Sequence, residues 1–92
     1  MDANEEAWLR GVAQRLGLSG EAAFDDEAKR VLLRLTKVTA DATGIRYLAP
    51  LTAFVVGRAA GHAESVGERF DLRAASDAVT ALAAAWGPPK EG

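Results

Sequence analysis

RYLAPLTAFVVGRAAGH, residues 46–62, is the stretch that decides the fold. Its proline, Pro50, suits the first turn of a helix, where the missing N–H breaks no hydrogen bond. The residues that follow are apolar on two faces rather than one, which is typical of a helix that contacts several neighbours. We therefore expect a helix over about residues 50–63, placed centrally in the domain.

One face of this helix carries unusually small side chains. Its members are Ala53, Val56, Gly57, Ala60 and Gly61. A glycine inside a helix destabilises it by about 0.5–1 kcal/mol relative to alanine. We therefore expect a packing reason for Gly57 and Gly61, namely the close approach of another helix backbone.

Three further helices follow from apolar periodicity, and no stretch alternates apolar and polar residues as a strand would. Their apolar stripes are Leu9, Val12, Ala13 and Leu16; Val31, Leu32, Leu35, Val38, Thr39 and Ala42; and Leu72, Ala75, Val79, Leu82, Ala83 and Trp86. Their expected starts are Asp2 or Asn4, the acidic cluster 25–27, and Asp71, and their expected ends are Gly17, Gly44 and Gly87. Trp8 and Trp86 are expected at the edges of the core. The sequence thus predicts an all-α fold, a small four-helix bundle.

Length and composition limit the kind of protein. Ninety-two residues, 49% of them hydrophobic, suffice for one core, so we predict a single helical domain over residues 1–87 and a disordered tail at 88–92. The chain has no cysteine, and its acidic N-terminus does not resemble a signal peptide. The apolar stretch 47–63 is broken by Arg58 and His62 and is too short for a membrane helix. We expect a cytoplasmic protein with no membrane contact.

The charge distribution is uneven. The net charge is −2, whereas nucleic-acid-binding proteins present a basic surface, so a nucleic-acid partner is not expected. Residues 31–63 carry four basic residues and one acidic residue, and this middle third is therefore positive in an otherwise acidic chain.

Four residues are candidates for binding an anion or another small ligand. Arg46 and Thr52 flank the start of the central helix, where free N–H groups and the helix dipole attract anions. Arg58 and His62 are i, i+4 neighbours on one face of that helix. A purely structural interpretation remains open: Arg46 is surface charge, Thr52 bonds the backbone of the first turn, Arg58 pairs with a carboxylate such as Asp41, and His62 faces solvent.

Motifs for catalysis and for cofactor binding are missing from the sequence. The single histidine has no second metal ligand at i+4, no serine has a base in a catalytic motif, and no glycine-rich loop could hold a phosphate. We therefore expect a protein that is not an enzyme and that holds neither a metal nor a cofactor.

Several motifs together resemble a known family. They are Trp8-Leu9, Leu16-Gly17-Leu18, a leucine-rich second helix, Arg46-x-x-Ala49-Pro50-Leu51-Thr52-x-Phe54 and Gly57-x-Ala59-Ala60-Gly61. This pattern is similar to a family of small actinobacterial domains of unknown function, the DUF6457 type. In that family the domain stands alone or is fused to a guanylyltransferase-like domain of molybdenum cofactor biosynthesis. The resemblance covers most of Trp8 to Trp86 and implies no particular chemistry.

The chain also departs from that family at two places. Members often carry a histidine near the end of the second helix and a proline directly after the arginine. Here Asp41 or Ala42 stands near the first position and Tyr47 occupies the second. What carries over is a signature turn without an assigned role, made of Arg46, Pro50, Leu51 and Thr52.

Two functions follow from these observations. The leading hypothesis is a non-enzymatic interaction or accessory module whose partner is another protein, with a link to molybdenum cofactor biosynthesis that comes from the resemblance alone. The alternative is a protein that binds a small anionic ligand, a phosphate or a nucleotide, through Arg46, Thr52, Arg58 and His62. The formation of a homodimer is left open.

Overall fold

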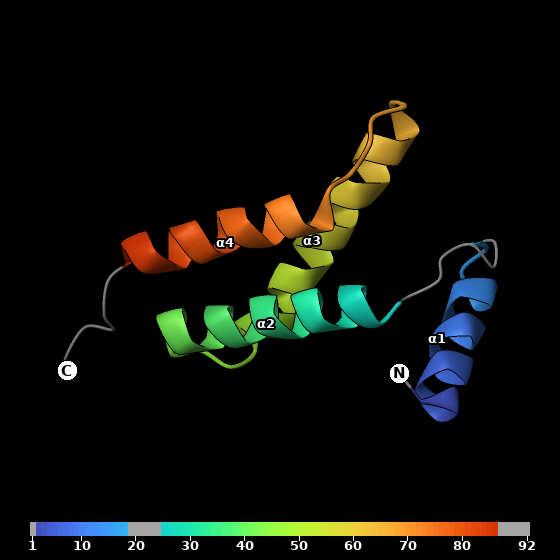
Figure 1. Ribbon diagram of the computed structural model, residues 1–92, viewed down its shortest axis with the longest axis horizontal. Coiled ribbons are helices and arrows are strands. Elements are labelled where there is room, and N and C mark those ends of the chain that lie inside the picture. The colour runs from blue at the N-terminus through green and yellow to red at the C-terminus, as the bar shows by residue number, and fades with distance from the viewer. Residues whose placement is uncertain (1, 19–24, 87–92) are drawn as a thin grey trace. The chain divides into compact units, whose positions relative to one another are not determined.

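The computed structural model describes residues 2–18 and 25–86, and within these ranges it contains four helices and no strand (Figure 1). They are α1 (Ala3–Arg15), α2 (Asp26–Thr43), α3 (Leu48–Ser65) and α4 (Leu72–Trp86). The predicted all-α fold is confirmed, and the expected central helix corresponds to α3. The expected stop at Gly87 and the expected tail, 88–92, lie outside the described residues.

The chain divides into two compact units. Met1–Arg30 contains α1 and the first turn of α2, and Val31–Gly92 contains the rest of α2 with α3 and α4. The single domain over residues 1–87 stays a prediction. Each unit is described by itself below.

The starts of α1, α2 and α4 are set by side chains that accept hydrogen bonds from free backbone N–H groups, whereas α3 follows its N-cap residue Tyr47 without such a bond. The Asp2 carboxylate accepts from the Glu5 N–H at 2.8 Å, and the Glu5 carboxylate accepts in return from the Asp2 N–H at 3.1 Å. Asp25 and Asp71 each accept from the N–H three residues later, at 2.7 and 3.1 Å. Such contacts stabilise a helix by about 1 kcal/mol each. The expected starts at Asp2, the acidic cluster and Asp71 are confirmed.

An ion pair joins α1 to the first turn of α2 within the first unit. The Lys29 Nζ lies 3.0 Å from Glu5 Oε1 and donates a hydrogen bond to each oxygen of that carboxylate. The Lys29 ammonium holds the pKa of Glu5 below its ordinary value of 4.5, helped by the bond from the Asp2 N–H, and Glu5 raises the pKa of Lys29.

This pair predicts a loss of stability in acid. A lowered carboxyl pKa means that the stabilisation by Glu5 is complete above pH 4.5, the pKa of the unfolded state, and is lost as the pH falls through the folded value. NMR titration of the Glu5 carboxyl should give a pKa below 4.5, and Lys29→Gln should raise it. Lys37→Gln, which removes a cation from the second unit, should leave it unchanged. If the pKa of Glu5 were the same in Lys29→Gln as in the unchanged protein, the result would contradict the ion pair.

The second unit is built around α3, which crosses α2 and α4 (Figure 1). Leu35 on α2 is fully buried, and Val56 and Ala63 on α3 are buried as well. Thr39 and Ser76 are buried polar residues, and the Thr39 hydroxyl donates to the Leu35 carbonyl oxygen at 2.9 Å. The central place expected for α3 is therefore seen within this unit.

The small face of α3 does not have the packing role that we expected. No atom of the described residues lies within 4 Å of a Cβ placed on Gly57 or Gly61, apart from the nearby backbone of α3 itself. Both glycines are exposed, because α3 turns Val56 and Ala63 rather than the glycines towards its neighbours. The expectation of a close helix approach at Gly57 and Gly61 is wrong.

Gly57→Ala and Gly61→Ala are consequently expected to stabilise the protein, by about 0.5–1 kcal/mol each, because alanine is the better helix former and meets no neighbour. Gly17→Ala is the matched control. Its Cβ also meets no atom within 4 Å, but Gly17 has φ +77°, so alanine there should destabilise. Chemical denaturation followed by circular dichroism measures all three. If Gly57→Ala and Gly61→Ala both lost stability, another part of the protein would have to cover the small face of α3.

Both tryptophans lie elsewhere than expected. Trp8 and Trp86 were expected at core edges, but their exposed fractions are 72% and 63%. On α1 only Ala13 is buried among the described residues, and Leu16 of its apolar stripe is exposed. Trp86 closes the last turn of α4, where it lies over a groove.

Candidate interaction groove

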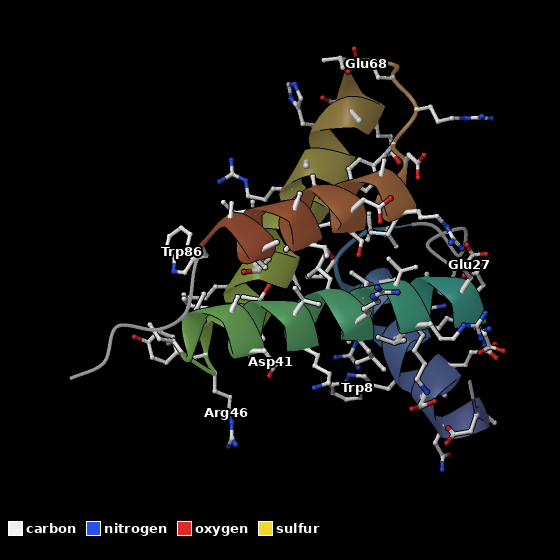
Figure 2. All side chains as sticks on the ribbon, turned by 60° about the vertical axis from the view of Figure 1, so that its left-hand side comes forward. Trp8, Glu27, Asp41, Arg46, Glu68 and Trp86 are labelled. Carbon is white, nitrogen blue, oxygen red and sulfur yellow. The ribbon has the colours of Figure 1, made fainter. Side chains whose placement is uncertain are left out.

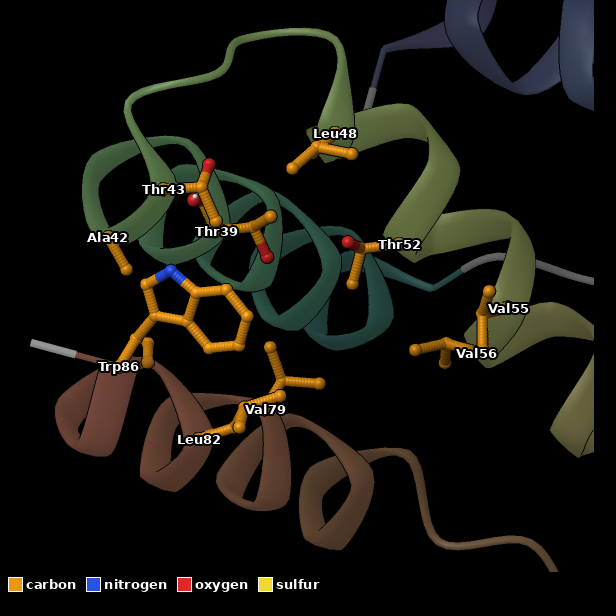
Figure 3. Close-up of a pocket in the computed structure, with 11 residues that line it drawn as sticks. Thr39, Ala42, Thr43, Leu48, Thr52, Val55, Val56, Val79, Leu82 and Trp86 are labelled. Atoms are coloured by element: carbon orange, nitrogen blue, oxygen red, sulfur yellow. Dashed lines mark hydrogen bonds between the residues drawn. The ribbon is translucent and has the colours of Figure 1, made fainter. Parts of the chain in front are cut away.

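A groove opens between α2, α3 and α4 in the second unit (Figure 3). Its volume is about 320 Å³. The residues that line it, which we call the interhelical groove, are Thr39, Ala42 and Thr43 of α2; Leu48, Thr52, Val55 and Val56 of α3; and Val79, Leu82, Ala83 and Trp86 of α4. Apart from three threonines, every one of these side chains is hydrophobic.

Two of the threonines use their hydroxyls on their own helix. Thr39 donates to the carbonyl oxygen of Leu35, and Thr43 donates to that of Thr39, both at 2.9 Å. Such bonds leave a hydroxyl with little to offer a ligand. The Thr52 hydroxyl makes no hydrogen bond to any described residue, and Thr52 projects into the groove (Figure 3). The backbone bond considered for Thr52 is therefore not seen.

The rim of the interhelical groove exposes large apolar side chains. Val55 and Leu82 are more than half exposed, as is Trp86, whose indole reaches over the groove towards Ala42 and Thr43 (Figure 3). Isolated exposed apolar residues are ordinary on protein surfaces, whereas a contiguous apolar hollow marks a binding site.

Charge is absent from the lining of the groove. The last nine residues of α4, 78–86, contain no charged side chain. On α2, Lys37 and Asp41 lie outside the lining and neutralise each other in an exposed i, i+4 pair, with Nζ to Oδ2 at 3.1 Å. Asp41 is thus paired with Lys37 and is not the partner considered for Arg58.

The four candidate ligand-binding residues do not all face one site. Thr52 lines the interhelical groove, whereas Arg46, Arg58 and His62 are exposed and lie outside its lining. Arg46 extends away from the turn before α3 (Figure 2). At about 100° per residue, Arg58 lies roughly a third of a turn around α3 from Thr52. Arg58 and His62 share a face, as their spacing indicates.

The start of α3 has few donors left for an anion. The Leu48 N–H donates to the Ile45 carbonyl oxygen at 3.1 Å, and the Ala49 N–H donates to the Arg46 carbonyl oxygen at 3.2 Å. Pro50, the next residue, has no N–H. An anion seat at a helix start depends on free N–H groups, and here the first three positions provide none. Anion binding by Arg46, Thr52, Arg58 and His62 stays a prediction.

Other kinds of site were also sought in the described ranges, 2–18 and 25–86. They contain no group of three or more side chains that could hold a metal ion, and none of their helices is both long and apolar enough to cross a membrane.

The sequence contained a signal for the groove that our interpretation missed. A helix on the surface of a small protein normally has a charged face opposite its apolar stripe. Residues 78–86 have no such face, since Leu82 and Trp86 are accompanied there only by alanine, valine and threonine. This lack of charge, more than the apolar periodicity, distinguishes a helix end that borders an apolar groove.

Comparison with known proteins gives one match. The family model of the domain of unknown function DUF6457 matches residues 2–91. No curated protein and no solved structure matches the chain. The matched range spans all but the terminal residue of each unit and contains every residue of the interhelical groove.

Proposed function

The chain belongs to the DUF6457 family of domains of unknown function, and we propose that it is a non-enzymatic interaction module whose interhelical groove receives an apolar segment of a partner protein. The observation that carries this proposal is the groove itself, an uncharged apolar hollow with exposed apolar side chains on its rim. None of its lining side chains is acidic, basic or a thiol. Such a surface supports binding rather than catalysis.

A helix of the partner is the segment that fits this surface best. The interhelical groove lies between three helices and is partly open to solvent. Hydrophobic grooves between helices can accept the apolar face of an amphipathic helix. Complete burial of one Val or Leu side chain stabilises a complex by about 1.5–3 kcal/mol. Val55, Leu82 and Trp86 are each about 60% exposed, so covering all three would contribute on the order of 3–5 kcal/mol to the complex. A micromolar complex needs roughly 8 kcal/mol, so further contacts of the partner must supply the rest.

We also propose what kind of protein the partner is. The resemblance of the signature turn, Arg46 with Pro50, Leu51 and Thr52, to actinobacterial domains suggests a guanylyltransferase-like protein of molybdenum cofactor biosynthesis. We propose that the module acts beside such a protein in the cytoplasm, either on a separate chain or fused to it.

Two matched substitutions test the groove. Leu82 and Leu33 are each 58% exposed, but Leu82 lines the groove and Leu33 on α2 does not. Leu82→Glu should weaken binding to the guanylyltransferase-like protein of the source organism at least about tenfold, a change of ~1.4 kcal/mol, because it places a charge in an apolar contact. Leu33→Glu should bind as the unchanged protein does. Isothermal titration calorimetry measures both.

A pull-down from a lysate of the native host applies the same comparison to proteins that were not chosen beforehand. A protein retained by the unchanged chain and by Leu33→Glu, but lost from Leu82→Glu, identifies the partner of the groove. Equal retention by both variants would contradict docking in the groove, provided that circular dichroism shows both to be folded.

A further inference from the structure

We infer that the Thr52 hydroxyl selects among partner helices, because the apolar face that enters the interhelical groove must carry one uncharged side chain that forms a hydrogen bond with Thr52. This inference rests on the proposed function, since a helix of the partner protein stays the occupant of the groove. It adds the chemistry by which the groove recognises that helix, namely a single hydroxyl or carboxamide among apolar residues.

Thr52 differs from the other threonines of this chain in what its hydroxyl does. The chain has five threonines, all within the described residues. Four of them donate to a carbonyl oxygen three or four residues earlier in the same helix, at 2.9 Å, and these are Thr36, Thr39, Thr43 and Thr80. The Leu48 carbonyl oxygen stands at the same spacing before Thr52, yet the Thr52 side chain projects into the groove instead (Figure 3). Thr52 therefore presents an unused donor and acceptor in apolar surroundings.

Water reaches the Thr52 hydroxyl while the groove is open. Thr52 is half-buried, and within residues 2–18 and 25–86 no side-chain oxygen or nitrogen is shut off from water without a hydrogen-bond partner. A helix that fills the groove displaces this water. A hydroxyl that is buried without a hydrogen bond weakens a complex, whereas a hydroxyl whose bond is replaced does not. The partner must therefore supply a bond to Thr52.

The partner helix can supply this bond only from an uncharged side chain. Its backbone N–H and C=O groups bond one another within the helix. A carboxylate, ammonium or guanidinium would be left without a countercharge, because none of the groove lining is charged. The hydroxyl of serine or threonine and the carboxamide of asparagine or glutamine remain. One such polar contact among apolar ones also fixes the register of two packed helices.

Selection of helices from a peptide display library tests the inference. The library consists of amphipathic helices whose apolar-face positions vary among leucine, valine, phenylalanine, serine and asparagine. The binders kept are those that Leu82→Glu no longer binds, because Leu82 lines the groove. Helices selected by the unchanged protein should carry one serine or asparagine in the apolar face. Those selected by Thr52→Val, which has nearly the same shape but no hydroxyl, should be apolar throughout.

Isothermal titration calorimetry then measures the preference on one selected helix and on a copy with leucine in place of its asparagine, or alanine in place of its serine. The unchanged protein should bind the polar helix at least about fivefold more tightly, and Thr52→Val should prefer the apolar copy. An equal preference in the unchanged protein and in Thr52→Val would overturn the inference. The sequences selected by the unchanged protein decide the inference even if Thr52→Val does not fold.

Two control variants separate the hydroxyl of Thr52 from other changes in the groove. Thr52→Ser keeps the hydroxyl and should keep the preference for the polar helix. Thr43 is also half-buried in the groove lining, but its hydroxyl already donates to the Thr39 carbonyl oxygen and accepts from the Ile45 N–H at 3.1 Å. Thr43→Val should therefore select the same helices as the unchanged protein. A loss of the preference in Thr43→Val as large as that in Thr52→Val would contradict the assignment to Thr52.

The two proposals fail in different ways. Selected helices that need Leu82 but are apolar throughout would overturn the role of Thr52 while supporting the groove as the place where a partner helix binds. A library that yields no helix whose binding depends on Leu82 would overturn both.

Discussion

Leu35→Ala is expected to lower the free energy of unfolding by about 2–5 kcal/mol, the largest effect that we expect of an alanine substitution within residues 2–18 and 25–86. Leu35 is fully buried, and its carbonyl oxygen accepts the hydrogen bond of the buried Thr39 hydroxyl. Removal of its side chain leaves a cavity in a core that holds few other large residues. A domain of this size has about 5–14 kcal/mol of stability in total, so the variant should melt at a much lower temperature.

The control for this substitution lies two residues away on the same helix. Leu33 is 58% exposed, and Leu33→Ala should change the stability by less than about 0.5 kcal/mol. Urea denaturation followed at the helix signal of circular dichroism compares the two variants. Equal losses would mean that α2 does not turn Leu35 into the core.

Val56→Asp is expected to destabilise the protein by about 3–5 kcal/mol, the cost of an uncompensated buried charge. Val56 is 8% exposed on the inner side of α3, and neither the groove lining beside it nor the buried core contains a cation that could pair with an aspartate. The variant should unfold at a much lower urea concentration near neutral pH and should recover stability in mild acid, where the carboxylate takes up a proton.

Val66→Asp is the matched control, because Val66 follows the end of α3 and is 55% exposed. It should stay folded with little change in urea midpoint. An unfolding curve of Val56→Asp that matches that of Val66→Asp, with no dependence on pH, would contradict the buried position of Val56.

Local features of this protein were predictable because they depend on neighbours in sequence. Asp2, Asp25 and Asp71 begin helices by accepting bonds from N–H groups three residues away, and Gly17 and Gly44 end helices with φ of +77° and +70°. Cap and turn chemistry is complete within one or two helical turns, so the residues alone specify it.

The candidate site was predicted only in part. Thr52 was singled out as an anion ligand and does lie at a site, but that site is the apolar groove. The charged candidates Arg46, Arg58 and His62 were inferred from their nearness in sequence to the start or one face of α3. Helix geometry fixes how these side chains are spaced around α3. Whether they face the groove depends on the rotation of α3 against α2 and α4, which the spacing of residues does not specify.

The sequence by itself determined the helices, their caps, the apolar character of α3 and membership of the DUF6457 family. Only the tertiary structure decided which apolar residues are covered. Leu35 and Leu33 lie two residues apart, yet the first is fully buried and the second is mostly exposed. Likewise Gly57 and Gly61 face open space, whereas Trp86 and Leu82 border a groove. Burial depends on which faces of three helices meet, and an apolar residue has the same local pattern whether a neighbouring helix or a partner covers it.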